Sequence, residues 1–301
     1  MTKWEIVTLV NDATPGTDTG TWVYQLPTYG SIQDLELLIE ATNGPSGNAN
    51  NPIMDCITKI EVRDGLFRHL VTAPALMLYK HRSIIDHVAP QLSQVDTANA
   101  VQLMRLPILF GRFKGDEKYG LEVASMSEPD VAVTYDLTKV RACGATGFVP
   151  GSINLTLAVT RSVNGERANF PSGVFTRIGV VNLTPSSGRF DYKIPMLNKL
   201  VSMTIYAYKS GTDDGSLITS VRLDENRGER TSFNQEWANI QQAQLLMTGS
   251  SVPYTVNVPV GDRGNDSRPF LPTPAKDLDM VLTTPVSEGA LKVLNEYVEA
   301  L

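Results

Sequence analysis

Apolar and polar residues alternate over short stretches along most of the chain. In "GTWVYQLP" (Gly20–Pro27) aromatic and aliphatic residues occupy every second position, which predicts a half-buried β-strand that ends at a proline. The segment "GRFDYKIP" (Gly188–Pro195) has glycine, aromatic, tyrosine, aliphatic and proline residues at the same places, 168 positions later. The chain therefore contains the same strand pattern twice.

The repeat extends well beyond these two strands. "IQDLELLIEAT" (Ile32–Thr42) corresponds to "LVSMTIYAYKS" (Leu200–Ser210) at the same offset. "ITKIEVRDG" (Ile57–Gly65) corresponds to "ITSVRLDENRG" (Ile218–Gly228) at an offset of 161, because the turn before it is shorter in the second copy. A shared order of strands at a nearly constant offset predicts two copies of one domain. We place the domain boundary at the Asn164-Gly165 turn, so the predicted domains are residues 1–165 and 166–301.

Equivalent positions in the two copies are expected to be equivalent in space. Superposing the copies should bring Trp22 onto Phe190, Tyr24 onto Tyr192 and Leu35 onto Met203, and we expect all six side chains to be largely buried.

Each copy then changes to helical spacing. In "FNQEWANIQQAQLLM" the apolar residues recur near a period of 3.6, and Ser232 with Gln235 has the spacing of a capping box. In the first copy Thr72 is the expected cap and Pro74 lies in the first turn. We predict an all-β chain of two tandem eight-stranded jelly rolls, each with a short helix between its fourth and fifth strands. A pair of immunoglobulin-like domains is the alternative fold.

This plan resembles the double jelly-roll major capsid proteins of tailless icosahedral viruses, including internal-membrane phages such as corticoviruses and tectiviruses. The resemblance rests on the duplicated "GxWxYxLP/GxFxYxIP" strand, "IQDLELLIEAT", "ITKIEVRDG" and the helix in each copy, and it covers the chain almost end to end. It implies a bacteriophage or other viral structural protein that forms homotrimers. Such trimers are pseudo-hexagonal tiles that contact neighbouring trimers and minor capsid or penton proteins in the virion.

The resemblance also implies that the shell often overlies an internal lipid membrane. Lys3 and Trp4, a cation beside an aromatic residue near the terminus, fit a headgroup layer, but a simple first strand is the favoured interpretation. The insertion Ile84–Ala98 is apolar, and we expect it to act as a clasp between chains.

Composition narrows the function classes. The 301-residue chain carries a formal net charge of −6 without basic runs, which argues against direct sequence-specific nucleic-acid binding. Cys56 and Cys143 are expected to be buried thiols, since two cysteines make neither a disulfide framework nor a structural zinc site. The N-terminal sequence does not have the pattern of a signal peptide, and we expect assembly in the host cytoplasm.

No motif in the sequence points strongly to a catalytic or metal site. For the histidines, a surface role in a loop or at a helix end is favoured over metal binding, because the expected helix ends between His81 and His87. Ordinary turn chemistry is favoured over calcium binding for the oxygen-rich loops. The histidines are His69, His81 and His87, and the loop residues are Asn11, Asp12, Asp18, Asp213, Asp214, Asp262 and Asp266.

Two further patterns have a simple interpretation. Glu36 and Glu40 share one strand face and are expected to mark a solvated or inter-subunit surface rather than the carboxylate pair of a glycosidase. Asn154 and Asn182 match the glycosylation pattern by coincidence. We therefore expect no enzymatic activity, and no catalytic, cofactor-binding or metal-binding residues. A carbohydrate-binding protein or glycan hydrolase of two jelly rolls, and a virion spike or receptor-binding protein, are the alternatives.

Overall fold

The structure is a computed structural model of the 301-residue chain. It describes residues 3–48, 53–65, 68–93, 95–114, 116, 118–138, 147–163, 174–195, 199–209, 212–213, 215–226, 228, 230–249, 252, 254–260, 277–285 and 289–300. The chain divides into two compact units: Met1–Arg82 with Ala89–Ile178 and Glu299–Leu301, and Ser83–Val88 with Gly179–Val298.

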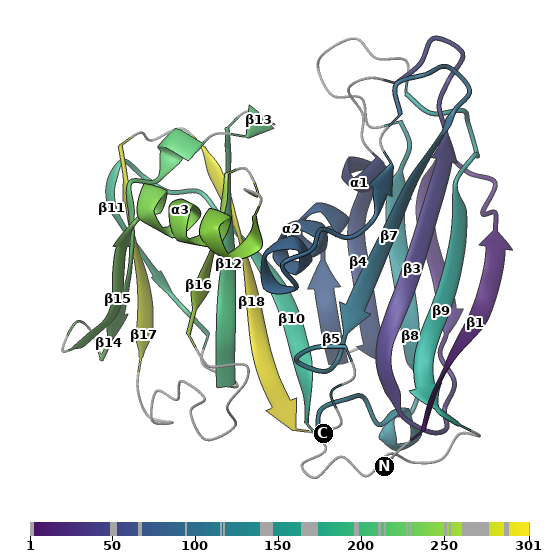
Figure 1. Ribbon diagram of the computed structural model, residues 1–301, viewed down its shortest axis with the longest axis horizontal. Coiled ribbons are helices and arrows are strands. Elements are labelled where there is room, and N and C mark those ends of the chain that lie inside the picture. The colour runs from purple at the N-terminus through teal and green to yellow at the C-terminus, as the bar shows by residue number, and fades with distance from the viewer. Residues whose placement is uncertain are drawn as a thin grey trace. The chain divides into compact units, whose positions relative to one another are not determined.

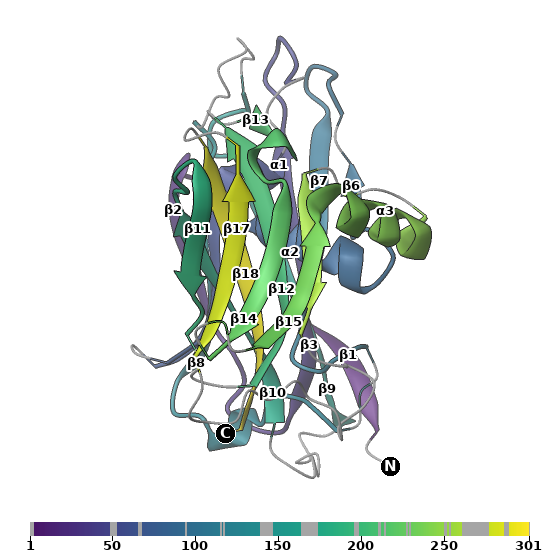
Figure 2. The same ribbon diagram turned by 90° about the vertical axis from the view of Figure 1, so that its left-hand side faces the viewer.

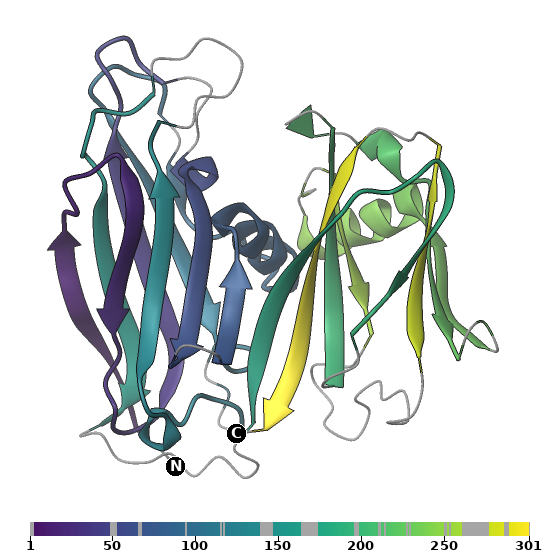
Figure 3. The same ribbon diagram turned by 180° about the vertical axis from the view of Figure 1, so that it is seen from behind.

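The first unit contains two antiparallel sheets (Figure 1; Figure 3 from behind). One has the order β1-β9-β3-β7-β6, and in the other β4 lies between β5 and β8, with β2 at the far side of β8. The elements are β1 (Trp4–Ala13), β2 (Thr19–Gln25), β3 (Ile32–Thr42), α1 (Ile53–Cys56), β4 (Ile57–Asp64), β5 (Arg68–Ala73), α2 (Ala75–Ile85), β6 (Leu92–Ser93), β7 (Val101–Leu109), η1 (Val123–Ser125), β8 (Pro129–Asp136) and β9 (Asn154–Ser162).

The second unit has the same organisation. β12 lies between β16 and β18, β10 follows β18, and the facing sheet has the order β11-β17-β14-β15, which Figure 2 shows in front. The elements are β10 (Val174–Leu183), whose first residues belong to the first unit, β11 (Gly188–Lys193), β12 (Lys199–Lys209), β13 (Thr212–Asp213), η3 (Gly215–Leu217), β14 (Ser220–Glu225), β15 (Arg230–Glu236), α3 (Trp237–Thr248), β16 (Thr255–Pro259), β17 (Leu278–Thr284) and β18 (Ala290–Ala300).

The two strand orders are identical once equivalent strands are matched. β1-β9-β3-β7 corresponds to β10-β18-β12-β16, and β2-β8-β4-β5 corresponds to β11-β17-β14-β15. Each set is an eight-stranded jelly roll, so the predicted all-β double jelly-roll fold is confirmed. We call them the first roll and the second roll.

The central strands β3 and β12 lie at equivalent places in the two rolls, and the superposition of Leu35 on Met203 stays a prediction. Both have eleven residues and occupy the same place in their sheets. Leu35 is opposite residues of β7 and β9, and Met203 is opposite residues of the equivalent strands β16 and β18. Both side chains are fully buried, as the repeat predicts.

The four aromatic residues of the repeat are less buried than predicted. Trp22 and Tyr24 on β2, and Phe190 and Tyr192 on β11, are half-buried. β2 and β11 are each the last strand of their sheet, so one flank of each has no strand beside it among the residues that the structure describes. Trp22 and Tyr24 stack on each other with ring centroids 5.9 Å apart, and Phe190 and Tyr192 pack against the margin of the second core.

The predicted starts of the helices were wrong. Ser232 and Gln235 do not form a capping box, because they belong to β15, where Gln235 is opposite Val221 of β14. Thr72 likewise belongs to β5, opposite Glu61. Pairing with a neighbouring strand outweighs the local capping preference at both places.

Each helix therefore follows the fifth long strand of its roll, whereas the prediction placed it between the fourth and fifth.

Two further expectations are only partly covered by the described residues. The predicted domain boundary at 165/166 lies outside them and stays a prediction. In the predicted clasp, Ile84 and Ile85 are part of α2, where Ile84 is buried and Ile85 half-buried, and Val88 is exposed. The clasp stays a prediction, with Val88 its most exposed apolar side chain among these three.

Candidate functional site

The three histidines occupy unlike environments. His69 lies on β5, where its Nδ1 atom is 3.3 Å from Glu61 Oε1. His81 is fully buried in α2, so the expectation of a surface role was wrong for this residue. His87 follows α2 and is exposed, with a backbone φ of 56°. Among the described residues, no group of three or more His, Cys, Asp or Glu side chains is placed to hold a metal ion.

The oxygen-rich turn near the N-terminus uses its side chains for hydrogen bonds. Asn11 Nδ2 donates to Asp12 Oδ2 at 2.9 Å, and the backbone N–H of Gly151, 133 positions away, donates to Asp18 Oδ1 at 2.7 Å. The Asp18 side chain therefore joins two distant loops rather than bonding the backbone of its own turn, as turn chemistry predicted. Asp213 is at the end of β13, and the remaining acidic loop residues, Asp214, Asp262 and Asp266, lie outside the described residues, as does Cys143. Cys56 is a buried thiol, as expected.

Glu36 and Glu40 lie on one face of β3 and are both half-buried. Arg105 of the neighbouring strand β7 places its Nη1 atom 3.3 Å from Glu36 Oε1. An arginine beside one carboxylate, on a strand in the middle of a sheet, is a cross-strand ion pair rather than the start of a two-carboxylate cleft. Of the two residues that match the glycosylation pattern, Asn154 accepts a hydrogen bond from Thr14 and Asn182 lies in β10. Trp4 is part of β1, opposite Ser162 of β9, as expected for a simple first strand.

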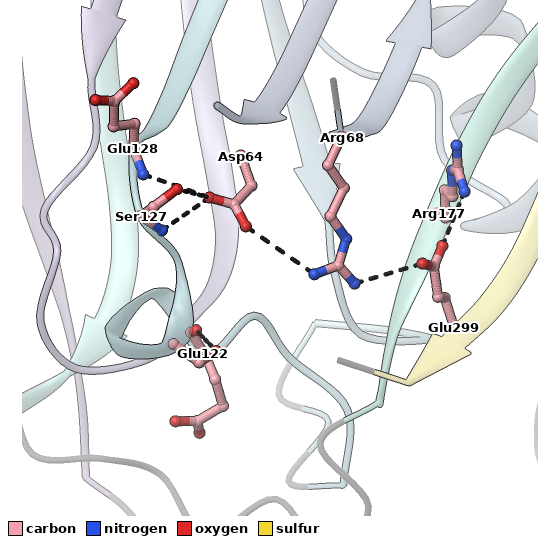
Figure 4. Close-up of polar contacts among 8 residues, drawn as sticks. Asp64, Arg68, Glu122, Ser127, Glu128, Arg177 and Glu299 are labelled. Carbon is pink, nitrogen blue, oxygen red and sulfur yellow. Dashed lines mark hydrogen bonds and ion pairs between the residues drawn. The ribbon is translucent and has the colours of Figure 1, made fainter. Parts of the chain in front are cut away.

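A network of charges that the sequence does not predict joins strand ends in the first unit (Figure 4). Arg68 at the start of β5 is 4.0 Å from Asp64 and donates to Glu299 at 3.4 Å, and Arg177 of β10 donates to the second oxygen of Glu299 at 3.1 Å. Asp64 in turn accepts the backbone N–H of Ser127 at 2.9 Å. Arg68 and Glu299 are 231 positions apart, so no local pattern could have indicated the contact.

A second charged pair closes the loop after β7. Arg112 donates through two nitrogens to the two carboxylate oxygens of Asp116, at 2.7 and 3.0 Å, and its guanidinium group lies 4.3 Å from the centre of the Tyr119 ring. The Asp116 side chain is almost fully buried. Burial alone raises the pKa of Asp116, but the hydrogen bonds from Arg112 and from the backbone N–H groups of Lys118 and Arg112 outweigh it, so the pKa is lowered.

The pKa of another buried carboxyl group, that of Asp34, is shifted in the opposite direction from the pKa of Asp116. Asp34 on β3 is 3% exposed and accepts one hydrogen bond, from Thr160 Oγ1 at 3.0 Å. Its Oδ2 atom has no hydrogen-bond partner among the described residues. Burial raises the pKa of Asp34, against the smaller effects of the Thr160 hydrogen bond and the Lys114 charge.

These groups do not converge on one cleft. The paired arginines and carboxylates tie loops to strand ends, which is a structural role. None of the described helices is long and apolar enough to cross a membrane. The open groove beside α3 in the second roll is lined mainly by uncharged residues, among them Ile218, Thr219, Trp237, Leu245 and Tyr254.

The fold is the double jelly roll found in viral major capsid proteins. No family model and no curated protein sequence matches the chain. Among solved structures, it resembles the major capsid protein of Sulfolobus turreted icosahedral virus with a TM-score of 0.72 and 10% identity, covering 98% of this chain and 96% of that one. It resembles the major capsid protein P2 from bacteriophage PM2 with a TM-score of 0.65 and 11% identity, covering 99% and 98%. For the Faustovirus major capsid protein the TM-score is 0.63 at 7% identity, covering 99% and 90%.

Proposed function

We propose that this chain is a major capsid protein, a structural protein of the virion without catalytic activity. The observation that carries the proposal is the exact duplication of strand order in one chain, in a fold shared over nearly the full length of known capsid proteins. Two similar rolls per chain, repeated three times around an axis, give a tile with six similar sides. Such a tile can meet six neighbours, and heterologous contacts between tiles build extended arrays.

The proposal includes the partners of such a shell. We infer a homotrimer that contacts neighbouring trimers, with minor capsid or penton proteins at positions that the tile does not fill. A lipid membrane beneath the shell and assembly in the host cytoplasm are part of the same proposal. The low share of charged side chains, 19%, suits a chain that buries extensive surface against copies of itself.

The first prediction tests this assembly. We expect the purified chain to form a stable trimer of about 99 kDa, three times the 32.9 kDa of one chain, in light scattering at micromolar concentration. Electron micrographs of particles that contain the chain should show a shell of pseudo-hexagonal tiles. A persistent monomer, or a chain that turns over glycans, contradicts the proposal and favours a carbohydrate-active protein.

A further inference from the structure

The helix of the second roll has a surface that is unusual for a helix in contact with water. α3, "WANIQQAQLLMT", contains no charged residue between Trp237 and Thr248. Trp237 and Ile240 are buried and fix the helix to the roll, while Leu246 is 82% and Met247 72% exposed. Leu245 is also exposed and lines the open groove next to the helix. Three consecutive exposed apolar residues beside a groove are typical of a protein interface.

The other copy of the repeat shows how the chain uses a helix at this position. α2 follows the fifth long strand of the first roll, as α3 does in the second, and none of its residues is exposed. Even Lys80, His81 and Arg82 of α2 are buried. The charged residues of α2 are therefore buried, whereas the uncharged α3 has an exposed face, which is the reverse of what solvation alone favours. Figure 2 shows α3 at the side of the second roll, next to β15.

We propose that the open face of α3 and its groove bind the first roll of a second copy of this chain. The inference rests on the proposed trimer. In a closed ring of identical two-roll chains the contacts are heterologous, so the second roll of each chain meets the first roll of the next. Covering α3 in this way gives the second helix of the repeat the burial that the first helix already has.

A lipid surface fits α3 less well than a protein surface does. Helices that lie in a membrane interface carry lysine or arginine along their polar face, and α3 carries neither. The first roll, by contrast, offers exposed apolar side chains of its own, including Val23, Tyr29 and Val101. An apolar, uncharged patch on one roll and apolar side chains on the other are the ordinary composition of an interface core.

The test is a double variant, Leu246→Lys with Met247→Lys, compared with the double variant Asn182→Lys with Thr184→Lys. Both α3 side chains are exposed, and lysine is favourable in the last turn of a helix, so the fold should be retained in circular dichroism. Asn182 and Thr184 are exposed on the second roll, where β10 lies at the other end of the sheet from β16, which contacts α3, so they control for adding two charges elsewhere on that roll. In sedimentation velocity we expect the α3 variant to trimerise at least tenfold more weakly, and the control variant to remain a trimer.

Three outcomes separate this inference from the proposed function. An α3 variant that trimerises like the unaltered chain overturns the α3 interface and leaves the capsid proposal intact. Equal weakening by the control variant, Asn182→Lys with Thr184→Lys, overturns the specificity for α3. An unaltered chain that never trimerises overturns the proposed assembly and the inference with it.

The identity of the occupant is tested by a photo-crosslinking residue, benzoylphenylalanine, at position 246 of the assembled protein. We expect cross-linked peptides from the first roll of another chain. Cross-links to the second roll, to a different protein or to lipid in purified particles overturn the assignment of the partner.

Discussion

At the scale of single residues, buried carboxylates separate into groups that stabilise the fold and groups that strain it. Asp116 receives two hydrogen bonds from Arg112 and two from backbone N–H groups, whereas Asp34 receives one, from Thr160. Their pKa values accordingly shift in opposite directions. Both residues lie on the first roll, so they can be tested against each other in one protein.

Asp116→Asn should be strongly destabilising, because it leaves the nearly buried Arg112 guanidinium group without its carboxylate partner. Breaking a buried pair in this way costs about 3–5 kcal/mol. Since the pKa of Asp116 is lowered in the folded chain, its contribution is fully present above the unfolded value of 3.8 and is lost as the pH falls through the folded value. Urea unfolding should show a constant penalty down to about pH 4 and a smaller one below it.

The matched control is Asp191→Asn, because Arg189 and Asp191 make the same kind of hydrogen bond, at 2.8 Å, on the exposed surface. That substitution should leave the free energy of unfolding almost unchanged, because solvent screens an exposed ion pair. Equal effects of the two substitutions would mean that burial of the Arg112–Asp116 pair contributes nothing.

Asp34→Asn should have a pH dependence of the opposite sign. The raised pKa means that the Asp34 contribution is fully present below the unfolded value of 3.8 and is lost as the pH rises through the folded value. The stability of Asp34→Asn relative to the unaltered chain should therefore increase with pH from about pH 4 to a plateau, in urea unfolding at a series of pH values. Thr160→Val removes the hydrogen bond that lowers this pKa and should move the rise to higher pH.

A flat difference across the pH series contradicts this prediction. The charged groups whose fields act on Asp34 are Lys114 and Arg82, which favour the carboxylate, and Glu36, which opposes it. A flat profile with a destabilised variant would show that the two cations compensate the burial of Asp34 in full.

At the scale of elements, the sequence predicts what alternation and repetition determine. β3 and β12 are both strands of eleven residues with Leu35 and Met203 buried, because a one-residue slip would turn these side chains out of the core. The helix starts were not predictable, since Ser232 and Gln235 satisfy a local capping rule but gain more from the ladder with β14. The sequence also did not predict which strands are edge strands: nothing in "GTWVYQLP" indicates that, among the described strands, β2 pairs only with β8.

The candidate sites also differ in how far the sequence predicts them. Residue type predicts that Asn11 and Asp18 form hydrogen bonds, but not that the partner of Asp18 is the backbone N–H of Gly151, 133 positions away. The network of Arg68, Arg177 and Glu299 depends on strand ends that are far apart in the sequence and adjacent only in the fold. The open face of α3 is visible in the sequence as an uncharged helix, but its exposure required the structure.

At the scale of the whole molecule, a duplicated jelly roll implies two cores, each able to unfold by itself. Leu35→Ala and Met203→Ala remove equivalent, fully buried side chains, and each should cost about 2–5 kcal/mol in its own roll. Since about 1.4 kcal/mol is a factor of ten in an equilibrium constant, hydrogen exchange limited by unfolding of a roll should accelerate at least about thirtyfold. Mass spectrometry of peptides should place the acceleration in the first roll for Leu35→Ala and in the second for Met203→Ala. If either variant accelerates exchange equally in both rolls, the chain unfolds as one cooperative unit. The duplication would then have produced a single folding unit, and the two rolls of the proposed tile would not have independent stabilities.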